Sequence, residues 1–237
     1  MKICLISPPS RANSQILPLS LINLASWLER EGFDVSVIDV KIDPFAAMDS
    51  GVISKIIDET VRQAISRRPD IIGITCFSSD YLSVMRIAAL LKADFDARIV
   101  VGGVHPTVKH EDFLYPGTPV DFVVVGEGEG AFCELIKNIG NDVRGVPGIA
   151  FLQDDKVIFT GPCEALDLDN LPMPAYHKIN MNYYLKVSRV IIRYLYISGA
   201  HIFTSRGCPF DCIFCANRNI WKKQRQALAV RYRPIGQ

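Results

Sequence analysis

The sequence predicts an α/β fold built on a doubly wound parallel sheet of five strands. Within the first 140 residues, five short apolar runs alternate with stretches whose apolar residues recur at helical spacing. The run Ile71–Thr75 is apolar almost throughout, as expected of a strand that is covered on both faces. Alternating strands and helices form parallel sheets, and right-handed crossovers then place the helices on both faces.

Turn-forming residues bound these apolar runs. Pro8 and Pro9 end the first run, and glycines follow the fourth and fifth runs directly. The predicted strands are Ile3–Ser7, Val35–Val40, Ile71–Thr75, Arg98–Val101 and Val120–Val125.

Four helices are predicted from apolar stripes between the strands. Gly32 stands where the C-terminal cap of the first helix belongs, and Pro69 follows the end of the second. The stripes are Leu21, Leu24, Ala25 and Leu28, then Ile53, Ile56, Ile57 and Val61, then Val84, Ile87, Ala88 and Leu91, and last Phe132, Leu135, Ile136 and Ile139. A short helical or turn segment is expected around Val108–Leu114.

The loops that follow the strands are rich in glycine and hydroxyl groups. In a doubly wound sheet, ligands bind beyond the carboxyl ends of the strands, where the strand order switches. Glycines there allow a backbone to approach a ligand closely. We therefore expect a wide, flat, polar-rimmed cleft. The loop Gly126–Gly130 matches neither the Gly-x-Gly-x-x-Gly dinucleotide fingerprint nor a P-loop.

The sequence changes character after residue 140. A β-hairpin is expected from 148–152 and 156–160, and a proline-containing stretch around Leu171–Ala175 reads as a stiff linker. Residues His201–Thr204 resemble the first strand of a barrel that delivers the next loop at its carboxyl end. We divide the chain into 1–140, a linker over 141–197, and 198–237.

Three cysteines, Cys208, Cys212 and Cys215, carry the strongest chemical signal. Their spacing is Cys-x3-Cys-x2-Cys. Three thiolates this close in sequence can hold three irons of a 4Fe–4S cluster, and the fourth iron is left open. A zinc site completed by His201 or Cys163 is the alternative, although zinc sites more often combine two Cys-x2-Cys pairs.

This motif resembles the signature of the radical S-adenosylmethionine (SAM) superfamily, in which an aromatic residue precedes the third cysteine. Phe214 matches that position. The resemblance implies that the open iron binds SAM, that reduction cleaves SAM into methionine and a 5′-deoxyadenosyl radical, and that Phe214 flanks SAM.

The strand-following loops resemble the cobalamin-binding domain that precedes the radical SAM domain in one large branch of that superfamily. The matching pieces are Pro-Pro after the first strand, serines after the third, Gly-Gly-x-His-Pro-Thr after the fourth and Gly-Glu-Gly-Glu after the fifth. The resemblance implies a flavodoxin-like sheet, followed by the first unit of a partial (β/α) barrel. The implied cobalamin-lining residues are Ser10, Ser78, Gly102, Gly103, His105, Thr107, Gly126, Glu127, Gly128 and Glu129.

No histidine lies in the Asp-x-His-x-x-Gly pattern of the mutases and methionine synthase. The resemblance therefore implies a base-off cobalamin without a histidine ligand. His105 is then either a pocket residue or a residue that braces the turn after the fourth strand.

The composition limits the classes of partner. Net charge is +1, no apolar stretch is long enough to span a bilayer, and seven cysteines with three clustered do not indicate a secreted disulfide framework. We expect a cytoplasmic protein that acts on a small molecule, with an electron donor such as flavodoxin or ferredoxin, and no membrane partner. From Ala216 onward there are basic but no acidic residues, which we interpret as a solvated face or a surface for another domain rather than a nucleic-acid site.

Three functions follow from these patterns. The leading one is the front portion of a cobalamin-dependent radical SAM enzyme, a transferase that methylates an unactivated centre or catalyses a related rearrangement or cyclisation. Only about one barrel unit is present, so catalysis by this chain alone is not expected, and its catalytic residues stay unassigned. The second is a cobalamin-binding module without turnover. The third is a tRNA methylthiotransferase, although Cys4, Cys76 and Cys133 lack the flanking sequence of its extra cluster ligands.

Overall fold

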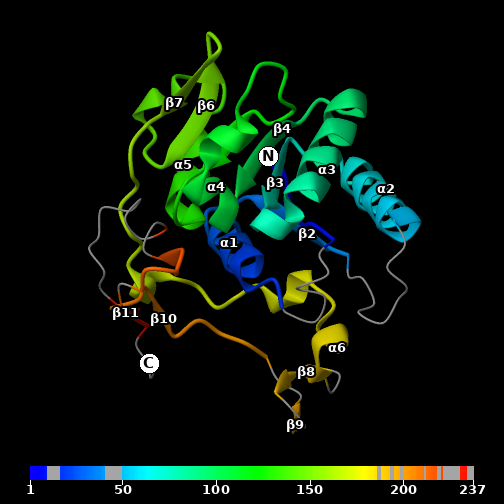
Figure 1. Cartoon of the computed structure of the whole chain (residues 1–237), viewed down its shortest axis with the longest axis vertical. Helices are drawn as coiled ribbons and strands as arrows, with labels where there is room; N and C mark the ends of the chain where they lie inside the picture. Colours follow the sequence, from blue (N-terminus) through cyan, green and yellow to red (C-terminus); the bar gives the residue numbers. More distant parts are fainter. Residues whose placement is uncertain are drawn as a thin grey trace.

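The computed structural model describes residues 1–9, 17–40, 50–185, 188–192, 195–197, 200–210, 212–217, 220 and 230–233. A seven-stranded sheet forms its centre (Figure 1). Its strands are β1 (Lys2–Ser7), β2 (Asp34–Asp39), β3 (Ile71–Thr75), β4 (Arg98–Gly102), β5 (Phe122–Val124), β6 (Ile149–Gln153) and β7 (Lys156–Phe159). The helices beside it are α1 (Leu19–Arg30), α2 (Ser50–Ser66), α3 (Tyr81–Asp94), α4 (Val104–Val108) and α5 (Gly128–Asn138).

The first five strands are parallel and follow the order β2-β1-β3-β4-β5, which confirms the predicted doubly wound arrangement. Leu5 in β1 pairs with Val37 of β2 on one side and with Gly73 of β3 on the other. The strand order reverses between β1 and β3, so the crevice at their carboxyl ends is the expected ligand position.

Alternate residues of each strand supply two separate cores. In β1, Ile3 and Leu5 pack on the face covered by α1 and α5, whereas Cys4 and Ile6 pack on the face covered by α2 and α3. All four side chains are almost completely buried. This alternation follows from the two-residue period of a strand, and it explains why the run reads as continuously apolar.

The prediction of five strands was two strands short. The hairpin of β6 and β7 joins the same sheet, because β6 pairs antiparallel with β5 and Phe151 lies opposite Phe122. It therefore extends the sheet, whereas the sequence pattern assigns it to the linker. Ile149 and Ala150 are fully buried, so the hairpin covers what would otherwise be an exposed edge at β5.

Two further corrections concern the segments near the expected site. The motif after β4 is not only a loop, since Val104–Val108 forms α4, followed by a 3₁₀ turn, η2 (His110–Phe113). No strand covers 201–204. The extended residues are β10 (Ser205–Arg206), which pairs antiparallel with β11 (Arg231–Tyr232) instead of starting a parallel barrel.

The remaining elements are short. They are η1 (Ser78–Asp80), η3 (Val143–Gly145), η4 (Leu168–Asn170), η5 (Tyr176–Lys178), α6 (Met181–Tyr184), β8 (Ser188–Ile192) and β9 (Leu195–Ile197). β8 and β9 form a two-stranded antiparallel pair. Among the helices that the structure describes, none combines the length and the apolar character needed to cross a membrane.

Candidate functional site

A cavity of about 740 Å³ lies at the carboxyl ends of β1, β3, β4 and β5. Its floor is apolar and consists of Leu5, Gly73, Val100, Val124 and Phe132. A Cβ atom on Gly73 would lie 2.9 Å from the Leu5 side chain and 3.3 Å from Phe132, so glycine lets these two residues meet over the sheet. The expected flat, polar-rimmed cleft is thus an apolar-floored cavity, because the strand residues that reach it come from the buried core.

Glycine-rich turns from β4 and β5 form one rim of the cavity. Gly103 has φ +109° and ψ −163°, a conformation that is open essentially to glycine alone. Thr107 joins the two turns. Its hydroxyl donates to the Gly103 carbonyl (2.7 Å) and accepts from the Gly126 amide (3.0 Å). Gly102, Gly103, Thr107, Gly126 and Gly128 all line the cavity.

Other predicted residues lie away from this rim. Ser78 is exposed in η1 and does not line the cavity, whereas its neighbour Phe77 does. His105 packs between Tyr81 and Phe113, with ring centroids 5.4 and 5.1 Å away, and its Nε2 lies 2.9 Å from an Asp112 carboxylate oxygen. The contacts of His105 with Tyr81, Phe113 and Asp112 therefore stabilise the turn after β4. The prediction for Ser10 falls outside the described residues.

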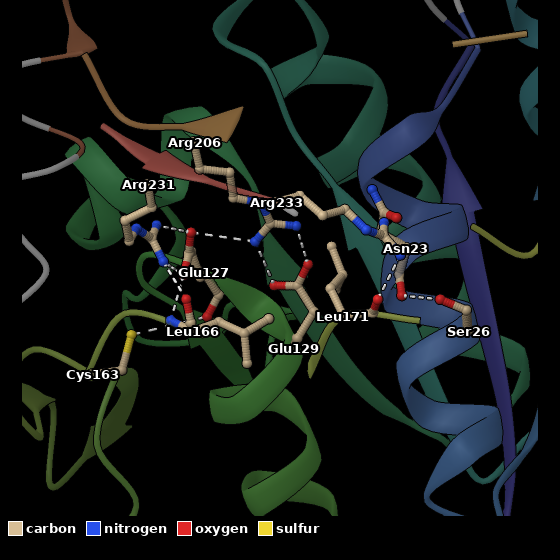
Figure 2. A network of polar contacts seen from close by, with 10 residues as sticks. All are labelled: Asn23, Ser26, Glu127, Glu129, Cys163, Leu166, Leu171, Arg206, Arg231 and Arg233. Carbon is tan, nitrogen blue, oxygen red and sulfur yellow. Dashed lines mark hydrogen bonds and ion pairs between the residues drawn. The ribbon is translucent and has the colours of Figure 1, made fainter. Parts of the chain in front are cut away.

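Glu127 and Glu129 line the cavity and are also ion-paired (Figure 2). Arg206 contacts both Glu129 oxygens, at 2.5 and 3.2 Å, and lies 3.3 Å from Glu127. Arg231 pairs with Glu127. Burial lowers the pKa of the Arg206 guanidinium, but the two carboxylates outweigh burial and raise that pKa above its ordinary value. The basic stretch after Ala216 therefore pairs, at Arg231, with the chain's own acidic loop.

The segment that leads into the cysteine motif also lines the cavity. We call residues 201–207 the strap, and its lining members are His201, Ile202, Phe203, Ser205, Arg206 and Gly207. Asn217 and Ile220, which follow the motif, also line the cavity. The cysteine loop thus leaves the cavity wall at Gly207 and returns to it at Asn217.

The three motif cysteines are accessible, and the other four are not. Cys212 is exposed, and Cys208 and Cys215 are half-buried. The Cys215 amide donates to the Cys212 carbonyl (3.1 Å), which makes a turn. Phe214 is 89% exposed and does not line the cavity. The described residues show no group of three ligating side chains close enough to hold a metal.

The two alternative zinc ligands, Cys163 and His201, lie in different surroundings. Cys163 is buried beneath Gly148, its thiol 3.9 Å from the Glu127 carbonyl, while His201 is exposed on the strap. Burial raises the pKa of the Cys4 thiol, and burial together with the charge of Asp80 raises the pKa of Cys76 to about 12. Such thiols are inert packing residues.

Sequence similarity to known proteins identifies the family of this chain. A model of the B12 binding domain matches residues 10–136. An uncharacterised methyltransferase of Pyrococcus horikoshii is 31% identical over 227 residues, which cover 92% of this chain and 45% of that protein.

The chain belongs to the B12-binding-domain branch of the radical SAM superfamily.

One further relative and one solved structure are also similar to the chain. The anaerobic magnesium-protoporphyrin IX monomethyl ester cyclase of Synechocystis is 29% identical over 237 residues, covering 95% of this chain and 44% of the cyclase. The solved structure of the radical SAM methyltransferase TsrM of Kitasatospora setae, with tryptophan and a SAM analogue bound, matches with TM-score 0.69 and 22% identity. That match covers 98% of this chain and 43% of TsrM, and it shows a shared fold. The chain spans less than half the length of these relatives.

The B12-binding fold explains the position of the cavity, but sequence patterns missed some of its residues. Phe77, Phe132 and Arg206 line the cavity, and none was among the predicted residues. Phe132 reads as an ordinary helix-core residue. The basic segment after Ala216 could have indicated Arg231 as a partner of the acidic glycine-rich loop, but Arg206 lies outside that segment.

Proposed function

We propose that this chain is the cofactor-binding front portion of a cobalamin-dependent radical SAM enzyme. One observation carries the proposal: the strap lines the cavity at the carboxyl ends of the sheet strands, and the cysteine loop starts and ends at that cavity. The volume of about 740 Å³ falls in the upper part of the range of small-molecule and cofactor sites, roughly 300–1,000 Å³.

The residues of the cavity fit a large, flat, mostly apolar cofactor face. The floor offers aliphatic and aromatic carbon, and Gly102, Gly103 and Gly126 present backbone without side chains in the lining. Polar groups of Glu127 and Glu129 are already engaged by arginines, so they position the rim and leave the backbone to contact the cofactor. His201 is the one histidine in the lining among the described residues, and it stands on the strap, which supports a cobalamin without a histidine ligand from the sheet.

The cysteine loop supplies donors that suit an iron–sulfur cluster. Cys208, Cys212 and Cys215 lie on one short, accessible loop, and cysteine thiolates are the usual cluster ligands. When bound, cobalamin would carry a methyl group and the cluster would cleave SAM reductively, as the family resemblance implies. The strand-following turns of this chain would hold the cobalamin, and Cys208, Cys212 and Cys215 would hold the cluster on the loop that begins and ends at the same cavity.

The reaction class that we propose is methyl transfer to an unactivated centre of a small molecule, or a related rearrangement or ring closure. An electron donor such as flavodoxin or ferredoxin would serve the cluster. A second function, a cobalamin-binding module without turnover of its own, is supported by the match of residues 10–136 to the B12 binding domain.

A crossed loading experiment tests the proposal. The protein is reconstituted without oxygen with iron, sulfide and hydroxocobalamin, then desalted. We expect a retained corrin absorbance and about four irons per chain. Gly102→Leu should lose cobalamin and keep iron, because a Cβ there makes only ordinary contacts (3.7 Å) while the longer side chain takes up cavity space.

The cysteine variant gives the opposite pattern. Replacement of Cys208, Cys212 and Cys215 together by alanine should abolish iron and leave cobalamin bound. Gly145→Leu is the matched control for Gly102→Leu, since Gly145 lies in η3, away from the cavity, and a Cβ on it meets nothing within 4 Å. Colourless wild-type protein, or iron retained by the triple variant, would refute the corresponding half of the proposal.

A further inference from the structure

Four charged side chains form a buried network at the N-terminus of α5 (Figure 2). The side chains of Glu127 and Glu129 are 8% and 6% exposed, and those of Arg206 and Arg231 are 11% and 14% exposed. Two carboxylates and two guanidiniums balance in charge. Such burial is tolerated only when every charge has partners, so none of the four can be removed without leaving another charge uncompensated in a low-dielectric interior.

The contacts between Arg206 and Glu129 have the geometry of a specific pair. The two terminal nitrogens of Arg206 reach the two Glu129 oxygens at 3.2 and 2.5 Å, a fork that lysine cannot reproduce. Glu129 also stands in the first turn of α5, where the helix dipole favours a negative charge.

A second ion pair, between Arg231 of β11 and Glu127, lies beside the pair of Arg206 and Glu129. Arg206 of β10 lies directly opposite Arg231 of β11. Arg231 binds Glu127 and the Leu166 carbonyl, while the Leu166 amide donates to Glu127 (2.8 Å). Both strands of the short β10–β11 pair therefore contact the sheet domain, β10 through Arg206 and β11 through Arg231.

The position of Arg206 makes this network more than a stabilising cluster. Arg206 lies on the strap that lines the cavity, and it precedes Cys208 by two residues. Its partner Glu129, in the first turn of α5, lines the same cavity. One ion pair therefore joins the wall made by the sheet, the wall made by the strap and the start of the cysteine loop.

We propose that Arg206 and Glu129 are a positioning pair that holds the strap closed over the cavity and fixes where the cysteine loop begins. Neither residue takes part in the chemistry. This inference rests on the proposed function for the identity of what the cavity and the loop hold, but the closure of the strap is a property of the chain itself.

Native-state hydrogen exchange measures strap closure without any cofactor. We compare the wild type with Arg206→Lys, Glu129→Gln and the double variant. In Glu129→Gln, which leaves Arg206 without its charged partner, we expect the hydrogen-bonded amides of the β10–β11 pair to exchange at least about 100-fold faster. Arg206→Lys keeps the charge but loses the two-nitrogen contact, so exchange should accelerate by a smaller factor, and the double variant should add little further increase. Amides of β1 and β3 should keep wild-type rates.

Lys137→Met is the matched control. It breaks the exposed pair of Lys137 with Glu31 (2.9 Å) at the other end of α5, and strap exchange should not change. An acceleration that is uniform over strap and sheet would overturn the proposal, because it would show that the network only contributes to global stability. Unchanged strap exchange in both single variants would overturn it as well.

A second measurement uses protein loaded with hydroxocobalamin. Release of the cofactor, followed by its absorbance after dilution into excess apo-acceptor, should be at least about tenfold faster in Arg206→Lys than in the wild type. If the wild type binds no cobalamin, the proposed function fails. The hydrogen-exchange result would still show whether the Arg206–Glu129 pair holds the strap in place. If cobalamin binds but leaves both proteins at the same rate, the positioning role is refuted and the proposed function stands.

Discussion

At the scale of single residues, Gly103 shows how backbone conformation shapes the cavity. It ends the turn after β4, precedes α4 and contributes to the lining. A Cβ atom would lie 2.9 Å from the Thr75 hydroxyl and 3.0 Å from both the nitrogen and the oxygen of the Cys76 backbone. Two of these neighbours are main-chain atoms of the loop after β3, and backbone atoms cannot shift without disturbing that loop.

Gly103→Ala should therefore destabilise the fold. The strained conformation alone accounts for about 1–3 kcal/mol, and we expect the free energy of unfolding to fall by roughly 2–4 kcal/mol once the clash is included. Urea denaturation measures this change. Gly130→Ala is the control, because Gly130 lies inside α5 and a Cβ on it would meet nothing within 4 Å. That variant should gain about 0.5–1 kcal/mol from helix propensity. Equal stability of the two variants would contradict this account.

The glycines that the family resemblance implies, Gly102, Gly103, Gly126 and Gly128, all line the cavity, and their contact with cobalamin stays a prediction. Ser78, implied by the same resemblance, is exposed and does not line the cavity, whereas its neighbour Phe77 does. Which of two neighbours in a 3₁₀ turn faces inward depends on the local path of the chain, and single-sequence patterns do not contain that information.

At the scale of elements, the β6–β7 hairpin decides how the sheet ends. β6 pairs with β5 through three residues, and the Phe151 ring packs on the Phe122 ring with centroids 6.1 Å apart. Without the hairpin, the short strand β5 would form an unprotected edge. The hairpin is therefore part of the unit that carries the cavity rim.

Phe151→Ala should test this role. Phe151 is 8% exposed, and truncation of a buried phenylalanine lowers the free energy of unfolding by about 3–5 kcal/mol. Phe210→Ala removes the same atoms from a side chain that is 69% exposed, and it should change stability by less than about 0.5 kcal/mol. Denaturation curves that coincide for the two variants would show that the hairpin is a separate appendage.

The periodicity of the sequence predicted the parallel strands and their helices, because each depends on a local pattern. The sheet position of the hairpin was not predictable in the same way. Whether two amphipathic strands pair only with each other or also with a third is decided by contacts between distant residues such as Phe122 and Phe151. The pairing of Arg206 with Glu129, 77 residues away, is non-local in the same sense.

At the scale of the whole molecule, the seven cysteines divide into two populations. Cys4, Cys76, Cys133 and Cys163 are buried, and burial raises the pKa of each of these thiols. The motif cysteines Cys208, Cys212 and Cys215 are accessible. Thiolates rather than thiols bind metals and react with electrophiles. The cysteines that are accessible for such chemistry therefore all lie on the loop that contains Cys208, Cys212 and Cys215.

Alkylation should reveal this division directly. At about pH 8, a thiol with a pKa near 12 is ionised in only about one molecule in 10⁴, so Cys76 should be protected by its pKa as well as by burial. In the reduced, metal-free protein, iodoacetamide should modify the three motif cysteines first, and mass spectrometry of the digested protein should find the other four unmodified until the fold opens. Because a raised pKa keeps the thiol protonated, raising the pH toward 12 should increase the reactivity of Cys76 while the fold persists.

Two controls show whether protection from alkylation comes from the fold or from bound metal. In concentrated guanidinium chloride all seven cysteines should react, which shows that protection comes from the fold. After anaerobic reconstitution with iron and sulfide, the motif cysteines should become protected as well, because thiolates that ligate a cluster are no longer free nucleophiles. Modification of Cys4 or Cys76 as fast as Cys212 in the folded, metal-free protein would contradict the burial on which the division rests, and motif cysteines that stay reactive after reconstitution would count against the cluster.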